Sequence, residues 1–226
     1  MWGKQAIWDP TTRVPLIISV PWFKHSAAKR FAPFFEMIDL FNTVVDLAGL
    51  PPPADVNDGT SAARFFQAGA ADHHGKDAAF MQYPRCIKPQ RSASSDNRSS
   101  SLQPLAWPPS LSEFDDHNPC TTGRQGQRTA FGWMGYSIRT FDWRYSVWLP
   151  WNGTSQTADW AVVDAPPGTY QELYAHGTSR NTTDWDSFDT EGENLAAADP
   201  LPPLHARAIA MLHARLHAAV LSWNQP

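Results

Sequence analysis

The segment at residues 133–150, WMGYSIRTFDWRYSVWLP, decides the fold of the second half of the chain. Residues 135–140 and 145–150 are rich in aromatic and β-branched side chains, which favour extended strands. Only residues 141–144 separate the two runs, and so short a link favours two antiparallel strands. The sequence therefore predicts a β-hairpin at this point.

Further strands and a closing helix are predicted on either side of the hairpin. Short strands are expected at residues 78–82, 160–163 and 172–174, and short links between successive strands favour an antiparallel sheet. Residues 204–223 place apolar side chains at spacings of three and four, which is typical of a helix with one apolar face. Two prolines just before this helix suit its first turn.

The N-terminal part has a different pattern. Residues 14–20, VPLIISV, form an apolar run whose length suits a strand buried on both faces, as in a parallel sheet. Residues 34–50 predict a helix, because apolar residues recur there at spacings of three and four. Gly49 stands where a helix C-cap belongs, and the prolines at 51–53 prevent continuation. The predicted order is a strand and a helix, then an antiparallel sheet closed by a helix.

Residues 87–130 differ in composition from the rest of the chain. They include the polar run SASSDNRSSS and the proline-rich run PLAWPPS. Such a segment buries too little apolar surface to offset the entropy lost on ordering, so we expect a disordered surface insertion. The chain then divides into residues 1–86, this insertion, and residues 131–226.

Length and composition limit the classes of function. The chain has 226 residues, 42% of them hydrophobic, which is enough for one domain or a domain with a small subdomain. The net charge of −4 gives no basic surface, so no nucleic-acid partner is expected. No apolar run approaches the about 18 residues that span a membrane, and residues 1–5 lack the apolar core of a signal peptide, so no membrane association is expected. Two cysteines are too few for a disulfide framework.

Two pairs of side chains have spacings that support chemistry, and each has a simpler interpretation. Cys120 and Arg124 match a C-x-x-x-R loop, in which the arginine would clamp an oxyanion. No strand precedes this loop and no helix follows it, so chance spacing is the simpler interpretation. His213 and His217 share one face of the last helix, as zinc ligands would. Because Ala214 replaces the glutamate of the zinc-protease pattern, solvated histidines are the simpler interpretation.

Two other pairs of titratable residues give weaker indications of a functional site. His73 and His74 form a pair in a loop, with no partner cluster. Asp39 and Asp46 share a face of the predicted helix 34–50, but paired carboxylates in acid catalysis need a facing residue, which the sequence does not indicate. Asp39 is therefore expected to be exposed or to cap the helix. No P-loop, dinucleotide-binding or G-x-S-x-G motif occurs in the chain.

Four stretches together resemble the sulfatase family. They are Trp2-Gly3-Lys4 with Thr12-Arg13-Val14-Pro15-Leu16-Ile17; Ile38-Asp39-Leu40-Phe41 with Asp46-Leu47-Ala48-Gly49-Leu50-Pro51 and Asp58-Gly59; Met81-Gln82-Tyr83-Pro84-Arg85 with Met134-Gly135-Tyr136-Ser137-Ile138-Arg139-Thr140 and Trp143-Arg144-Tyr145; and Glu172-Leu173-Tyr174 with Gly192-Glu193-Asn194-Leu195-Ala196. The third combination is similar specifically to iduronate-2-sulfatases, whereas many sulfatases share the second and fourth. Asn42 and Ala175 stand where the family usually has a proline and an aspartate. The resemblance covers most of the chain outside residues 87–130.

The resemblance implies an alkaline-phosphatase-like α/β fold. Residues 1–86 would belong to its α/β core, and residues 131–226 would form a small antiparallel C-terminal subdomain. Sulfatases use a formylglycine made from the cysteine of C-x-P-x-R and a calcium ion held by aspartates. That motif is absent from the 226 residues, Cys120 lacks its proline, and the implied calcium ligands lie outside this chain. Only Lys4 matches a catalytic position, where its ammonium would neutralise charge on the leaving oxygen.

Different classes of function remain open. The first is a sulfuric ester hydrolase acting on sulfated sugars, such as 2-sulfated uronates; this chain would be its C-terminal part, inactive alone and partnered by the missing N-terminal half. The second is a catalytically inert relic that binds sulfated glycans or a protein partner. A third is a phosphate or phosphonate ester hydrolase of the same superfamily. A lysosomal or secreted location is expected if a longer form carries a signal peptide.

Overall fold

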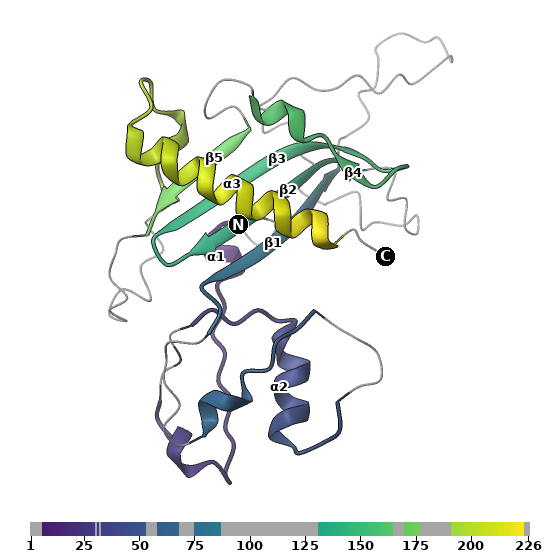
Figure 1. Cartoon of the computed structure of the whole chain (residues 1–226), viewed down its shortest axis with the longest axis vertical. Coiled ribbons are helices and arrows are strands. Elements are labelled where there is room, and N and C mark those ends of the chain that lie inside the picture. The colour runs from purple at the N-terminus through teal and green to yellow at the C-terminus, as the bar shows by residue number, and fades with distance from the viewer. Residues whose placement is uncertain are drawn as a thin grey trace.

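In the computed structural model of the protein, the described residues are 6–29, 31, 33–52, 58–67, 75–86, 131–164, 170–176 and 191–223. They form a mixed α/β structure with a small antiparallel sheet and a C-terminal helix. The strands are β1 (Ala78–Cys86), β2 (Phe131–Thr140), β3 (Trp143–Asn152), β4 (Thr157–Ala158) and β5 (Gln171–Ala175). The α-helices are α1 (Asp9–Thr12), α2 (Asp39–Leu47) and α3 (Pro203–Trp223), and short 3-10 helices lie at Lys24–Ser26, Ala63–Phe66, Trp160–Asp164 and Leu195–Ala197. Figure 1 shows the sheet with α3 as one unit and α2 in a second unit beyond the start of β1.

The sheet is built outward from the hairpin of β2 and β3. β1 pairs with β2, β5 pairs with the other edge of β3, and β4 pairs with the end of β3, all antiparallel. The predicted hairpin is confirmed, with a shorter link than expected because β3 already begins at Trp143. The strands predicted at residues 78–82 and 172–174 are also confirmed, as β1 and β5.

The strand predicted at residues 160–163 is wrong, because Trp160–Asp164 is a 3-10 helix. Asp159 explains the difference: its carboxylate accepts a hydrogen bond from the backbone N–H of Ala161 at 3.0 Å. An aspartate turn of this kind draws the backbone away from extended geometry. The ring of Trp160 stacks on that of Tyr136 with 5.7 Å between centroids, so this helix packs against the sheet.

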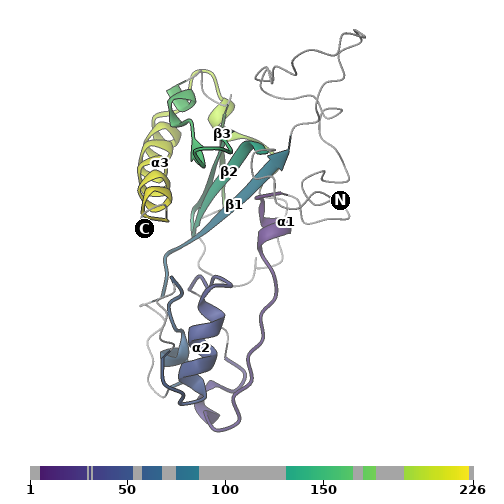
Figure 2. The same ribbon diagram turned by 90° about the vertical axis from the view of Figure 1, so that its right-hand side faces the viewer.

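One face of the sheet carries the hydrophobic core. Alternate residues of β2 and β3 point to this face, and they pack against the buried stripe of α3 formed by Ala208, Leu212, Leu216 and Val220. The predicted helix at residues 204–223 is confirmed, and α3 lies across this face in Figure 2. In the described part of the chain, no helix is both long and apolar enough to cross a bilayer.

The opposite face of the sheet is also buried, and it carries polar side chains as well as the rings of Trp133 and Trp148. Ser137, Arg144 and Ser146 have side chains pointing away from α3, and each residue is 2% exposed or less. Figure 2 shows α1 against this face, and Asp9 and Thr11 of α1 are buried as well. Burying polar groups costs free energy unless they are hydrogen-bonded. Each of these buried polar side chains is therefore expected to have hydrogen-bond partners on this face.

The helix predicted at residues 34–50 is present in shorter form, as α2. Gly49 follows it with a φ of +65°, the left-handed conformation expected after a helix C-terminus. The N-terminal limit was wrong because Phe34 forms a β-bridge with Lys76 and so cannot continue the helix. The expectation that Asp39 is exposed or caps the helix is wrong, because Ile38 stands at the N-cap of α2 and no side-chain capping bond is made there. Asp39 is 2% exposed, accepts hydrogen bonds from the backbone N–H groups of Glu36 (2.9 Å) and Thr60 (2.7 Å), and pairs with Lys76 Nζ at 2.7 Å.

The two faces of α2 are inverted relative to an ordinary surface helix. The buried side carries Asp39 and Thr43 beside Leu47. The opposite side presents Ile38, Phe41 and Val44, which are 54%, 58% and 50% exposed. A helix normally turns its apolar stripe toward the core, so the apolar side of α2 faces solvent in this structure.

The strand predicted at residues 14–20 is wrong. The segment has no regular secondary structure, and Val14, Leu16 and Ile17 are exposed, Ile17 to 92%. A strand needs a neighbour that takes up its backbone hydrogen bonds, and within the described part of the chain no backbone hydrogen bond is made by residues 14–19.

Candidate functional site

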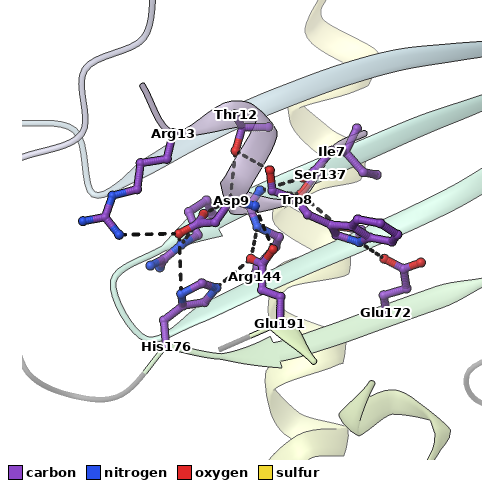
Figure 3. Close-up of polar contacts among 12 residues, drawn as sticks. Ile7, Trp8, Asp9, Thr12, Arg13, Ser137, Arg144, Glu172, His176 and Glu191 are labelled. Carbon is purple, nitrogen blue, oxygen red and sulfur yellow. Dashed lines mark hydrogen bonds and ion pairs between the residues drawn. The ribbon is translucent and has the colours of Figure 1, made fainter. Parts of the chain in front are cut away.

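A group of charged side chains lies buried on the α1 face of the sheet (Figure 3). We call it the buried charge cluster: Asp9 in α1, Arg139 in β2, Arg144 in β3, His176 after β5, and Glu191. Four of these side chains are 4% exposed or less, and that of Arg139 is 16% exposed. Charged side chains are almost never fully buried unless they are paired, and here they come from five segments of the chain.

Arg144 holds the cluster together. Its guanidinium pairs with Asp9 Oδ1, and its Nε donates to Glu191 Oε1 at 2.5 Å. Nη1 donates to the carbonyl oxygen of Ile7 at 3.0 Å and to Ser137 Oγ at 3.2 Å. The planar donor fork of arginine suits this use, since one side chain reaches several fixed acceptors. Arg144 therefore ties the sheet to both the N-terminal segment and Glu191.

Two further contacts complete the attachment of α1. The backbone N–H of Asp9 donates to Glu191 Oε2 at 2.7 Å, and Arg139 Nε lies 3.4 Å from Asp9 Oδ1. Beside the cluster, Trp8 Nε1 donates to Glu172 Oε2 at 2.9 Å. Burial raises the pKa of the Glu172 carboxyl, although its hydrogen bonds act in the opposite direction.

The ring of His176 lies between the two carboxylates. Its Nε2 is 2.8 Å from Glu191 Oε1, and its Nδ1 is 3.8 Å from Asp9 Oδ2. A carboxylate only accepts, so Nε2 carries a proton. Asp9 Oδ2 is a buried oxygen with no hydrogen-bond partner among the described residues.

The charges of the cluster hold its acids ionised. Burial alone would raise the pKa of Asp9, but Arg144, Arg139 and His176 hold it below its usual range. The Glu191 pKa is likewise lowered against the effect of burial, by its hydrogen bond to His176 and the charge of Arg144. Burial lowers the pKa of Arg139 to about 10, which leaves it charged at neutral pH.

A metal ion does not fit the buried charge cluster. Asp9, His176 and Glu191 offer three ligand atoms within 4.8 Å of one another. However, Arg144 and Arg139 already supply two positive charges to two carboxylates, so a divalent cation would be repelled. Calcium also requires six to eight oxygen ligands. The residues described here do not form the calcium site that the sulfatase resemblance implies.

The buried charge cluster is suited to holding α1 on the sheet and not to catalysing a reaction. Its carboxylates and guanidinium groups are engaged with one another and are almost fully buried. A nucleophile would need a base beside it and access for a substrate, and these side chains are almost fully covered. We therefore interpret the cluster as the element that fixes the segment after Lys4 onto the sheet.

Several of the predicted site residues cannot be placed, and one predicted pair is not brought together. Lys4, the pair Cys120 and Arg124, and the pair His73 and His74 lie outside the described residues, as does the predicted insertion at 87–130. Asp39 and Asp46 do not form a paired site, because Asp39 is buried and bound to Lys76 whereas Asp46 is exposed.

His213 and His217 differ from the prediction of solvated side chains. Both are half-buried, and their rings pack against that of Trp160, with centroids 5.5 and 4.2 Å away. This packing was not predicted from the sequence, because the segment that carries Trp160 was expected to be a strand and is a 3-10 helix.

Sequence reasoning also missed the buried charge cluster. Asp9 is 135 residues from Arg144 along the chain, and no local motif links the two. One signal was present: Arg144 and Ser146 alternate with apolar residues of β3. That pattern is typical of a strand with one solvated face, and only the position of α1 reveals that both faces are buried.

Comparison with protein-family models and with curated proteins finds no match for this chain.

Proposed function

We propose that the chain is the C-terminal part of a sulfuric ester hydrolase that resembles iduronate-2-sulfatase and acts on sulfated sugars. In this proposal the nucleophile and the metal ligands belong to a portion N-terminal to these residues, and the 226 residues alone are inactive.

The observation that carries the proposal is the meeting of separate sulfatase-like stretches in one buried assembly. Thr12, from the first stretch, lies 3.2 Å from Arg144, from the third, between Thr12 Oγ1 and Arg144 Nη2. In the fourth stretch, Asn194 Oδ1 accepts from the backbone N–H of Leu173 at 3.0 Å. Leu173 in turn pairs with Tyr145 of the third stretch across β5 and β3. The first, third and fourth stretches thus lie in one assembly, as parts of one family fold would, whereas the second stretch lies with α2 in the other unit.

The exposed apolar surfaces support the proposal that a further, N-terminal portion packs against these residues. The outer side of α2 and the side chains of Val14, Leu16 and Ile17 present apolar groups to solvent, and residues 14–19 make no backbone hydrogen bond within the described part of the chain. Large exposed apolar areas mark surfaces that contact other protein elements. An additional α/β portion that covers α2 and pairs with residues 14–20 would remove this exposure.

In the complete enzyme, Lys4 would bind a sulfate oxygen. The buried charge cluster, which begins five residues later at Asp9, would fix the path of the chain on that side. A formylglycine and a calcium ion from the N-terminal portion would supply the nucleophile and the steadying charge. The role of Lys4 is to neutralise charge that develops on the leaving oxygen.

The test uses the 226-residue chain and a longer form that includes a C-x-P-x-R segment. Sulfate release is measured from an aryl sulfate and from a 2-sulfated uronate disaccharide. We expect turnover only in the longer form, with Lys4→Ala reducing it by about two to three orders of magnitude. Lys24→Ala, at an exposed lysine, is the matched control and should leave turnover unchanged.

Each contrary result has a definite meaning. Turnover by the 226-residue chain alone, or a longer form that keeps full turnover with Lys4→Ala, would refute the assignment. An inert longer form that still binds the sulfated disaccharide would replace the proposal by the alternative, a glycan-binding relic. Cleavage of phosphate esters but not sulfate esters would move the chain to the related phosphoesterases.

A further inference from the structure

The turn between β3 and β4 carries an acceptor motif that has no role in the proposed hydrolase. Asn152-Gly153-Thr154 matches Asn-x-Ser/Thr, the sequence at which N-linked glycans are attached. The same pattern occurs at residues 97–99 and 181–183, which lie outside the described residues. Such triplets also arise by chance, so the surroundings of Asn152 decide whether its side chain is a usable acceptor.

Asn152 lies at a surface turn. It is the last residue of β3 and pairs with Thr157 of β4 across a four-residue turn at 153–156. Asn152 and Thr154 are both exposed, and so are the three residues that follow Thr154. Figure 1 shows β4, and with it this turn, on the side of the sheet away from the unit that contains α2. Exposed turns of small polar residues tolerate added groups well, so a glycan on Asn152 would displace no packed side chain.

The side-chain amide of Asn152 is held in one orientation. Its Oδ1 accepts hydrogen bonds from the backbone N–H groups of Thr154 at 3.0 Å and Ser155 at 3.1 Å, which forms a local asparagine turn. Backbone N–H groups only donate, so the amide atom that faces them is the oxygen and not the nitrogen. Within the described part of the chain, neither Asn152 Nδ2 nor the Thr154 hydroxyl makes a hydrogen bond. The nitrogen that would react and the hydroxyl that the motif requires are therefore both available.

We propose that Asn152 is a site of N-linked glycosylation. The donor is an oligosaccharide carried on a lipid diphosphate, and Asn152 Nδ2 attacks the anomeric carbon of its first sugar. The N–C bond forms as the C–O bond to the diphosphate breaks. The electron pair of that bond leaves with the diphosphate, and Nδ2 gives up one of its two protons to a base of the transferase. The product is still an amide, so Oδ1 continues to accept both backbone hydrogen bonds and the turn keeps its conformation.

Glycosylation at Asn152 goes beyond the proposed function and does not depend on hydrolase activity. It requires only that the chain passes through the secretory route. The site is also compatible with a further N-terminal portion, because the outer side of α2, which that portion would cover, belongs to the unit away from β4. A glycan on Asn152 would therefore not obstruct that contact.

The direct test uses the protein isolated from the cells that make it. The protein is digested, and the peptide that contains Asn152 is analysed by mass spectrometry. We expect this peptide to carry the added mass of a glycan, which a peptide N-glycosidase removes. An unmodified peptide as the sole form would overturn the proposal.

Variants secreted from eukaryotic cells separate the acceptor role of the triplet from its role in the turn. Thr154→Ser keeps the hydroxyl and should keep the glycan. Thr154→Ala removes the hydroxyl but keeps the backbone N–H that donates to Asn152 Oδ1, so the glycan should be lost while the circular dichroism is unchanged. Asn152→Asp keeps the acceptor oxygen of the turn but has no amide nitrogen, and it should also lose the glycan.

The matched control is Ser155→Ala, at the exposed residue just after the triplet, which should keep the glycan. Loss of the glycan in Ser155→Ala, or its retention on Asn152 in Thr154→Ala, would overturn the proposal. A secreted, folded chain that never carries a glycan on Asn152 would overturn it as well. Sulfate release tests the proposed function separately, so the failure of either proposal is distinguishable from the failure of the other.

Discussion

Removing the guanidinium of Arg144 should be among the most damaging single changes in the described part of the chain. In Arg144→Met, the buried carboxylates of Asp9 and Glu191 lose a shared cationic partner, and the carbonyl of Ile7 loses a donor. Breaking a buried ion pair from one side costs about 3–5 kcal/mol, because the remaining charge stays buried without compensation. For a chain of this size we expect the melting temperature to fall by about 6–20 °C.

The matched control is Arg215→Met. Arg215 also makes a two-pronged ion pair, with both carboxylate oxygens of Asp77 at 2.5 and 3.0 Å. These side chains are 40% and 72% exposed, however, and exposed pairs contribute about 0.2–1 kcal/mol. Urea denaturation of both variants beside the unaltered chain gives the two free-energy differences directly. Equal losses in the two variants would refute the argument from burial.

The effect of Arg144→Met should also depend on pH, in a direction set by the pKa values. The pKa values of Asp9 and Glu191 are lowered in the folded chain. Their contribution to stability is therefore present above the unfolded values of about 4 and is lost as the pH falls through the folded values. In Arg144→Met, protonation of the carboxyls removes the uncompensated charge. The difference between the two proteins should be largest near pH 7 and shrink toward pH 4, and a difference that does not vary with pH would contradict the mechanism.

Three smaller perturbations test other parts of the structure, each by urea denaturation. Gly135→Ala places a Cβ 2.7 Å from the Trp148 ring and should cost about 1–3 kcal/mol; a neutral result would mean that this ring is free to move. Thr43→Val removes the fully buried hydroxyl that accepts from the backbone N–H of Ala62 at 2.9 Å, so we expect a loss of about 1–3 kcal/mol, and stabilisation would contradict the hydrogen bond. Gly49→Ala should cost about 1 kcal/mol from its φ of +65° alone, since its Cβ would meet open space, and Gly49→Asn should cost less.

The elements whose structure follows from the local sequence pattern were predicted correctly. The β2–β3 hairpin, β5 and α3 follow from alternation, short links and helical spacing within each segment. The two failures have different causes. Trp160 follows an aspartate whose side-chain hydrogen bond forms a turn, and this bond outweighed strand propensity. Residues 14–20 have the composition of a strand, but no described neighbour pairs with them.

The buried charge cluster was beyond sequence reasoning for a different reason. Its charges are far apart along the chain, and an arginine in an alternating strand is normally solvated. His213 and His217 were noticed as a pair, but their environment depends on Trp160, which lies some fifty residues earlier. Spacing can show which side chains share a face of a helix, whereas what packs on that face is decided by the tertiary fold.

The arrangement of the sheet also bears on the order in which the chain folds. β2 and β3 are joined by two residues, whereas the contact between Asp9 and Arg144 closes a loop of 135 residues. Loop-closure entropy makes near contacts form before distant ones. We expect the β2–β3 hairpin to form first, β5 and α3 to cover one face next, and α1 to dock last. Until α1 docks, Arg144 remains hydrated on an open face, so its slow dehydration would be a late step of refolding.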